Sequence, residues 1–70
     1  MRKKDAVTEI TPPKGEKLWV SYYDDNHTLQ YILTSKETRD YYYLYEVAED
    51  GLKRLGRDRD PKVLEARFMT

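Results

Sequence analysis

The sequence contains no cysteine, which excludes disulfide bridges, Cys-ligated zinc, iron–sulfur clusters and thiol nucleophiles. It has a single histidine, His27, inside a polar stretch, and no partner that would orient it as a general base is evident. Its three glycines are too scattered to form a phosphate-binding loop. We therefore expect a protein that is not an enzyme and that uses no cofactor and no metal.

Long apolar segments are also missing. The longest uninterrupted apolar run is Tyr41 to Tyr45, far below the roughly 20 residues of a membrane span. The basic start Met1–Lys4 is not followed by the hydrophobic stretch of an export signal. Together with the absence of cysteine, this favours a cytoplasmic protein that neither enters a membrane nor acts on a small-molecule substrate.

The 70 residues provide one domain with a thin core, because 37% of them are charged. Residues 1–16 contain three consecutive basic residues and the Pro12-Pro13 pair, and we expect them to form a flexible N-terminal arm. Residues 17–70 then form a single small α+β domain.

Two segments rich in aromatic and branched residues, 18–23 and 28–34, flank a polar tetrapeptide and predict a β-hairpin. With Asp25-Asn26 at the centre of the turn, Tyr22 faces Leu29, Val20 faces Tyr31 and Leu18 faces Leu33. This register gathers six apolar side chains on one face, as alternation along a strand requires.

Four tyrosines in five residues predict a third strand over residues 41–47, in preference to a helix that begins at Ser35. The loop Glu49-Asp50-Gly51 leads into a short fourth strand over residues 52–55, in which Arg54 faces Glu46. Asp60-Pro61 is typical of a helix start, and the helix that follows places Leu64 and Phe68 on one side.

The predicted fold is thus a small antiparallel β-meander of three to four strands, with one C-terminal helix packed on one face of the sheet. The helix is too short to be stable alone, so it must cover the apolar face of the hairpin.

The chain has more aromatic residues than one small core can hold, and alternation predicts an exposed patch on the sheet face away from the helix. Aromatic side chains of this kind suit binding to another protein or to a second copy of the chain. The alternative is that Val7 and Ile10 of the arm fold back and cover this face. The predicted partner-binding residues are Trp19, Tyr23, Ile32, Tyr42 and Leu44.

Formal charge is zero overall but unevenly distributed: residues 1–17 carry +2, residues 18–50 carry −5 and residues 51–70 carry +3. In a meander the first and third turns lie at the same end, so we expect an acidic rim there, suited to a basic partner. Its members are Asp24, Asp25, Glu49 and Asp50.

Basic residues near the C-terminus support a second function, nucleic-acid binding together with the basic arm. The neutral total charge and the acidic sheet region argue against it, since affinity for phosphate backbones comes mainly from positive charge. The predicted contacts are Arg54, Arg57, Arg59 and Lys62.

Overall fold

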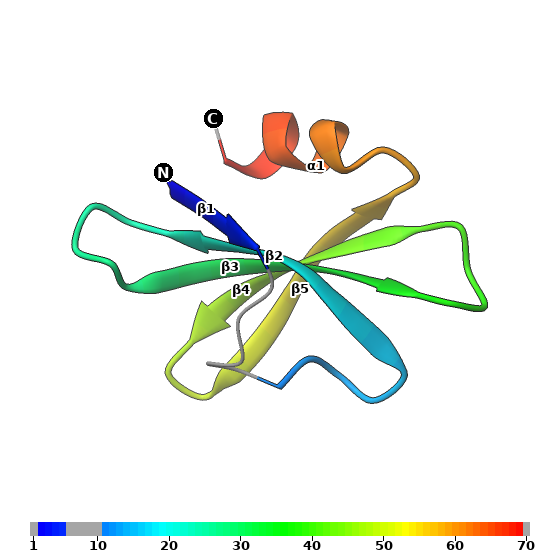
Figure 1. The fold of residues 1–70 in the computed structure, drawn as a ribbon, viewed down its shortest axis with the longest axis horizontal. Coiled ribbons are helices and arrows are strands. Elements are labelled where there is room, and N and C mark those ends of the chain that lie inside the picture. Colours follow the sequence, from blue (N-terminus) through cyan, green and yellow to red (C-terminus); the bar gives the residue numbers. More distant parts are fainter. Residues whose placement is uncertain (1, 6–10, 70) are drawn as a thin grey trace.

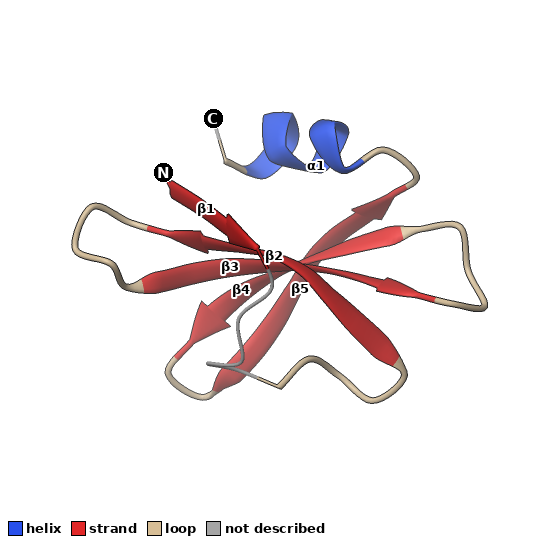
Figure 2. Ribbon diagram, viewed as in Figure 1, coloured by secondary structure: helices blue, strands red, loops and turns tan. Residues whose placement is uncertain are grey.

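The computed structural model describes the backbone of residues 2–5 and the whole of residues 11–69. One antiparallel sheet has its five strands in sequence order, and a single helix lies against one face of it (Figures 1 and 2). The elements are β1 (Arg2–Asp5), β2 (Glu16–Tyr23), β3 (Leu29–Lys36), β4 (Tyr42–Ala48), β5 (Gly51–Asp58) and α1 (Pro61–Phe68).

The predicted α+β meander with a C-terminal helix is confirmed, and β4 is a strand rather than part of a helix. The structure adds β1, which lies within the segment predicted as an arm and pairs with β2 from Arg2↔Tyr23 to Asp5↔Val20. The sequence of β1 is polar and has no strand-like alternation, so only backbone pairing to the edge of β2 reveals it. Val7 and Ile10, expected to cover the sheet, lie outside the described residues.

The β2–β3 turn is one residue longer than predicted, and this corrects the register of the hairpin. The amide of Asp24 donates to the carbonyl of Thr28, and the amide of His27 donates to the carbonyl of Asp24. His27 has a φ of 62°, so a left-handed residue closes this three-residue loop. The longer turn shifts the pairing by one residue, and an irregularity between Tyr22 and Tyr23 shifts it by one more, so Tyr22 faces Tyr31 and Val20 faces Leu33 instead of the predicted partners.

Two irregularities in the same hairpin move side chains between the faces of the sheet. One lies between Leu18 and Val20, and the other between Tyr22 and Tyr23. Each places an extra residue in one strand, which interrupts the alternation. Leu18 and Leu29, both predicted on the helix-side face, therefore pack on the opposite face, which we call the far face.

The helix-side core is built around four buried residues, Tyr22, Leu33, Leu44 and Leu64. Phe68 packs against the same cluster, as predicted, and its ring lies so close to Gly56 that a Cβ added there would be 2.8 Å from it. The Asp60 side chain accepts a 2.9 Å hydrogen bond from the amide of Lys62 and caps the helix, as the Asp-Pro pair predicts.

The far face has a second core of Ile32, Tyr43 and Tyr45. Leu18, Leu29 and Val47 are among the partly buried residues packed against it. A sheet with apolar side chains on both faces explains why so many aromatic residues are accommodated in 70 residues.

We expect Leu64→Ala to lower the free energy of unfolding by about 2–5 kcal/mol, because it leaves a cavity between the helix and the sheet. Val63→Ala, next to it on the exposed side of α1, is the matched control and should change stability by less than about 1 kcal/mol. Urea denaturation of both variants measures the difference. Equal losses would show that α1 is not anchored through Leu64.

The hydroxyl of Tyr22 on β2 donates a 2.6 Å hydrogen bond to the carboxylate of Glu65 and ties the helix to the sheet. Burial, and then this carboxylate, raise the pKa of Tyr22 above its ordinary value. The unfolded chain loses this proton near pH 10, whereas the folded state retains it. The stabilisation is thus complete below about pH 10 and is lost as the pH rises through the folded-state pKa.

Tyr22→Phe should therefore flatten the decline in stability above about pH 10, while costing about 1 kcal/mol near neutral pH through the lost hydrogen bond. Unfolding free energies measured from neutral to about pH 11 test this expectation. An alkaline decline of unchanged steepness in the variant would rule out Tyr22 as its source.

Candidate basic and aromatic binding site

The predicted aromatic docking face is not formed, because its five residues lie on both sides of the sheet. Tyr42 and Leu44 pack with the helix-side core, whereas Ile32 belongs to the far-face core. Tyr23, Ile32 and Leu44 are only 2%, 0% and 0% exposed. Three of the five side chains are therefore inaccessible to a partner.

The prediction was wrong because it assigned the side chains of β4 to the wrong faces of the sheet. Leu44 pairs with Leu33 on the helix-side face, so Tyr43 and Tyr45 turn to the far face, opposite to the prediction. Trp19 remains 43% exposed and meets Tyr42 edge to face, with ring centroids 6.3 Å apart. Its indole N–H donates to the Ser35 hydroxyl.

The described part of the far face carries a row of cations laid over tyrosine rings, which we call the cation–tyrosine strip. Arg57 and Arg59 lie 4.9 and 5.6 Å from the centre of the Tyr41 ring. Arg54 lies 4.6 Å from the centre of the Tyr43 ring, and the ammonium of Lys36 lies 5.9 Å from the same centre. The strip consists of Lys36, Tyr41, Tyr43, Arg54, Arg57 and Arg59.

A two-residue β4–β5 turn places Arg54 in this strip. Ala48 pairs with Gly51, so Arg54 lies opposite Tyr45 rather than opposite Glu46 as predicted. The strand also continues past the predicted end at Gly56 to Asp58, after an irregularity next to Leu44. Arg54 and Arg57 consequently both lie on the far face, opposite Tyr45 and Tyr43.

A buried carboxylate holds one end of the strip in place. Glu16 is 2% exposed at its side chain, and it accepts hydrogen bonds from the hydroxyls of Thr34, at 2.6 Å, and Tyr45, at 2.7 Å. Arg54 lies 3.7 Å from its second oxygen and donates a 2.9 Å hydrogen bond to the Tyr45 hydroxyl. One carboxylate from β2 thus links β3, β4 and β5.

The groups in this network change the pKa values of Tyr45 and Arg54. Burial raises the pKa of Tyr45, the Arg54 hydrogen bond opposes this rise and the Glu16 hydrogen bond adds to it, so the phenol keeps its proton and donates to the carboxylate. The hydrogen bond to Tyr45 raises the pKa of Arg54. Arg54 therefore remains a cation while about half of its side chain, 47%, stays exposed.

The other arginines of the strip have no carboxylate within 4 Å among the residues that the structure describes. Asp58 pairs with Tyr42 and points to the helix-side face, where its carboxylate accepts the amide of Asp60. Lys62, predicted with the arginines, lies on α1 and outside the strip. Of the four predicted nucleic-acid contacts, the structure brings three together.

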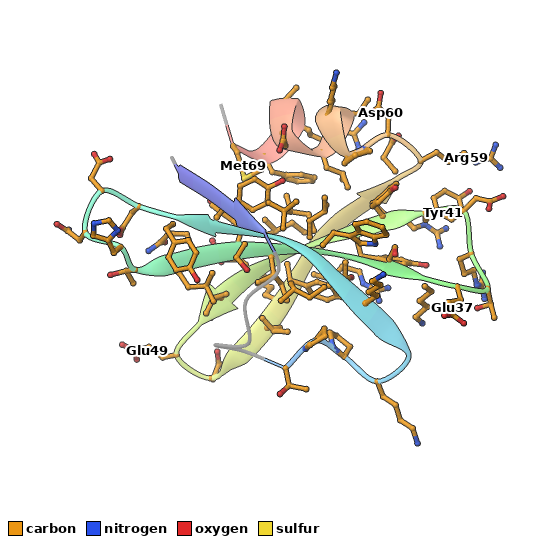
Figure 3. The ribbon with its side chains drawn as sticks, viewed as in Figure 1. Glu37, Tyr41, Glu49, Arg59, Asp60 and Met69 are labelled. Carbon is orange, nitrogen blue, oxygen red and sulfur yellow. The ribbon has the colours of Figure 1, made fainter. Side chains whose placement is uncertain are left out.

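The four residues of the predicted acidic rim lie in the β2–β3 and β4–β5 turns, which share one end of the sheet (Figure 1). Figure 3 shows Glu49 at that end and Tyr41, Arg59 and Glu37 at the other. The carboxylate of Asp24 is occupied in the turn, where it accepts hydrogen bonds from Asn26, Thr28 and Gln30. Asp25, Glu49 and Asp50 remain exposed.

Within residues 2–5 and 11–69, no helix has the length and apolar character needed to cross a membrane. The same residues contain no group of three or more potential metal-binding side chains of the His, Cys, Asp and Glu types.

Comparison of the chain with protein-family models, with curated proteins and with solved structures finds no match.

Sequence reasoning missed Glu16, Thr34 and Tyr45 as parts of the site. Glu16 was assigned to the arm, and no sequence signal distinguishes a carboxylate that will be buried from one that will be solvated. The signal available for the strip was the alternation Tyr41, Tyr43, Tyr45, which puts three tyrosines on one face of a strand. The sequence analysis placed Tyr43 and Tyr45 on the helix-side face, so it did not identify these tyrosines as the support for the arginines.

Glu16→Ala should lower the free energy of unfolding by about 2–3 kcal/mol, because two buried hydroxyl donors lose their acceptor and Arg54 loses its counter-ion. Glu37→Ala, an exposed loop carboxylate, is the control and should stay within about 0.5 kcal/mol of the parent. Chemical denaturation compares the two. A Glu16 variant as stable as the Glu37 variant would mean that the network is not a structural link.

Proposed function

We propose that this protein is a non-enzymatic binding module for nucleic acid, and that the cation–tyrosine strip contacts the phosphate backbone. The observation that carries the proposal is the row of exposed arginines over Tyr41 and Tyr43, two of which have no acidic partner in the described structure. The strip lies on the far face, and α1 lies against the opposite face of the sheet (Figure 2).

Stacking on the tyrosine rings prepares the arginines for this role. A guanidinium held over a ring has lost part of its rotamer freedom before a ligand arrives, so less entropy is lost on binding. A guanidinium group can donate two parallel hydrogen bonds to a phosphate. Its outer face can also stack on an unpaired base.

The neutral total charge argued against nucleic-acid binding, but the carboxylate that contacts the strip is compensated and the exposed turn carboxylates are distant from most of the strip. On the described far face, the carboxylate that contacts the strip is that of Glu16, and it is buried and already compensated by Arg54. The exposed turn carboxylates of Asp25, Glu49 and Asp50 lie at the other end of the sheet. Glu37 and Asp40, in the loop between β3 and β4, are the acidic residues closest in sequence to the strip.

The double substitution Arg57→Gln and Arg59→Gln should weaken binding to single-stranded DNA by on the order of tenfold or more, and should lower the slope of log affinity against log salt by about 1–2. Fluorescence anisotropy with a labelled oligonucleotide, repeated over a salt series, measures both quantities. The same titration with a duplex shows which form is preferred.

The matched control is Lys53→Gln with Arg67→Gln, which removes the same charge from exposed positions outside the strip. This variant should retain most of the affinity. Equal losses in the two variants would show that only total charge matters, and absence of salt-sensitive binding by the parent protein would contradict the proposal.

A protein partner is the second candidate, favoured by the exposed carboxylates of Asp25, Glu49 and Asp50 at one end of the sheet. These residues suit a basic surface on another protein. Charge reversal of the three, followed by measurement of association, separates this candidate from the first, because nucleic-acid binding should then strengthen rather than weaken.

A further inference from the structure

A pocket lies beside the cation–tyrosine strip, where β2 begins and β3 ends. It has a volume of about 700 Å³ and lies where the loop before β2 and the loop after β3 extend beyond the sheet. Its lining consists of Lys14, Gly15, Glu16, Lys17, Ser35, Lys36, Glu37 and Thr38.

Backbone geometry fixes one wall of this pocket. The amide of Glu16 donates to the carbonyl of Pro13, and Gly15 has a φ of 86°, which together define a tight turn with Lys14 at its tip. Glycine adopts this left-handed conformation without strain, and other residues rarely do. Lys14 is thereby held at the pocket rather than on a freely moving segment.

The pocket is electropositive. Lys14, Lys17 and Lys36 line it, and none has a carboxylate within 4 Å among the described residues. Of the two acidic residues in the lining, Glu16 is buried and neutralised by Arg54, which leaves Glu37 as the opposing exposed charge. Ser35 and Thr38 add hydroxyl groups. Such a set of donors suits a phosphate group.

Two lysines connect the pocket to aromatic rings on its two sides. The ammonium of Lys36 lies over Tyr43, the ring that Arg54 also covers, so the pocket continues directly into the cation–tyrosine strip. The ammonium of Lys17 lies 4.8 Å from the ring of Trp19, which is partly exposed. An anion held by Lys17 would therefore change the surroundings of this indole, the only one in the chain.

We propose that this pocket binds the terminal phosphate of a nucleic-acid strand whose backbone lies along the strip. The inference rests on the proposed function, and it specifies the terminal phosphate as the group of the nucleic acid that the pocket recognises. A terminal phosphate monoester carries about 1.5–2 negative charges and three free oxygens, whereas an internal phosphodiester carries one charge, so three ammonium groups favour the terminus.

The test uses single-stranded oligonucleotides of one sequence, with a 5′-phosphate, a 3′-phosphate or neither. One phosphorylated form should bind on the order of tenfold more tightly than the unphosphorylated form, with a change in Trp19 fluorescence that the latter does not produce. Lys14→Gln with Lys17→Gln should abolish the preference while leaving affinity for the unphosphorylated strand close to that of the parent protein. Lys53→Gln with Arg67→Gln should keep the preference.

Equal affinities for the three oligonucleotides would overturn this inference and leave the proposed function intact. Retention of the preference in the Lys14 and Lys17 variant would also overturn it, because the phosphate would then bind elsewhere. If none of the oligonucleotides binds, both the proposed function and the inference fall. Binding of a basic protein instead would support the second candidate.

Discussion

A single buried carboxylate organises the far side of this sheet. Glu16 lies at the start of β2, and its oxygens accept hydrogen bonds from Thr34 on β3 and Tyr45 on β4, while Arg54 on β5 provides the opposite charge. A buried carboxylate is costly unless it is hydrogen-bonded and compensated, so the four strands must lie in one relative register for it to be tolerated. The relative register of β2 to β5 and the position of Arg54 are therefore coupled.

This coupling explains how a neutral protein presents a basic surface. Arg54 compensates Glu16 and at the same time covers Tyr43, and the row of cations continues along β5 with Arg57 and beyond it with Arg59. The tyrosines serve both as core and as support: their inner edges pack against Ile32, and their outer faces hold guanidinium groups. The core of the far face thus supports the cation–tyrosine strip.

The helix-side face stabilises the fold by holding α1 against the sheet. Leu33, Leu44 and Leu64 form a closed apolar contact between sheet and helix, and the Tyr22–Glu65 hydrogen bond fixes the helix at its middle. With the helix on one face only, the other face remains accessible at the arginines. In a domain of this size, apolar side chains on both faces supply the burial that a single layer could not.

Much of the architecture follows from local sequence. Alternating aromatic and branched residues determined the strands β2, β3 and β4, and Asp60-Pro61 determined the start of the helix, because backbone preferences and capping act over a few residues. The sequence also showed that residues 18–50 carry a net negative charge and residues 51–70 a net positive charge. β1 was not, since its pairing depends on the free edge of β2 rather than on its own side chains.

Only the tertiary structure decided which face each tyrosine occupies and which arginines have partners. The longer β2–β3 turn with its left-handed His27, the two-residue turn before Gly51 and the irregularity between Leu18 and Val20 each shift the pairing by one position, and a shift of one reverses the faces of the side chains up to the next irregularity. The sequence does not reveal these shifts, because each of them depends on how a strand pairs and packs with its neighbours. They are selected by the packing of all strands together.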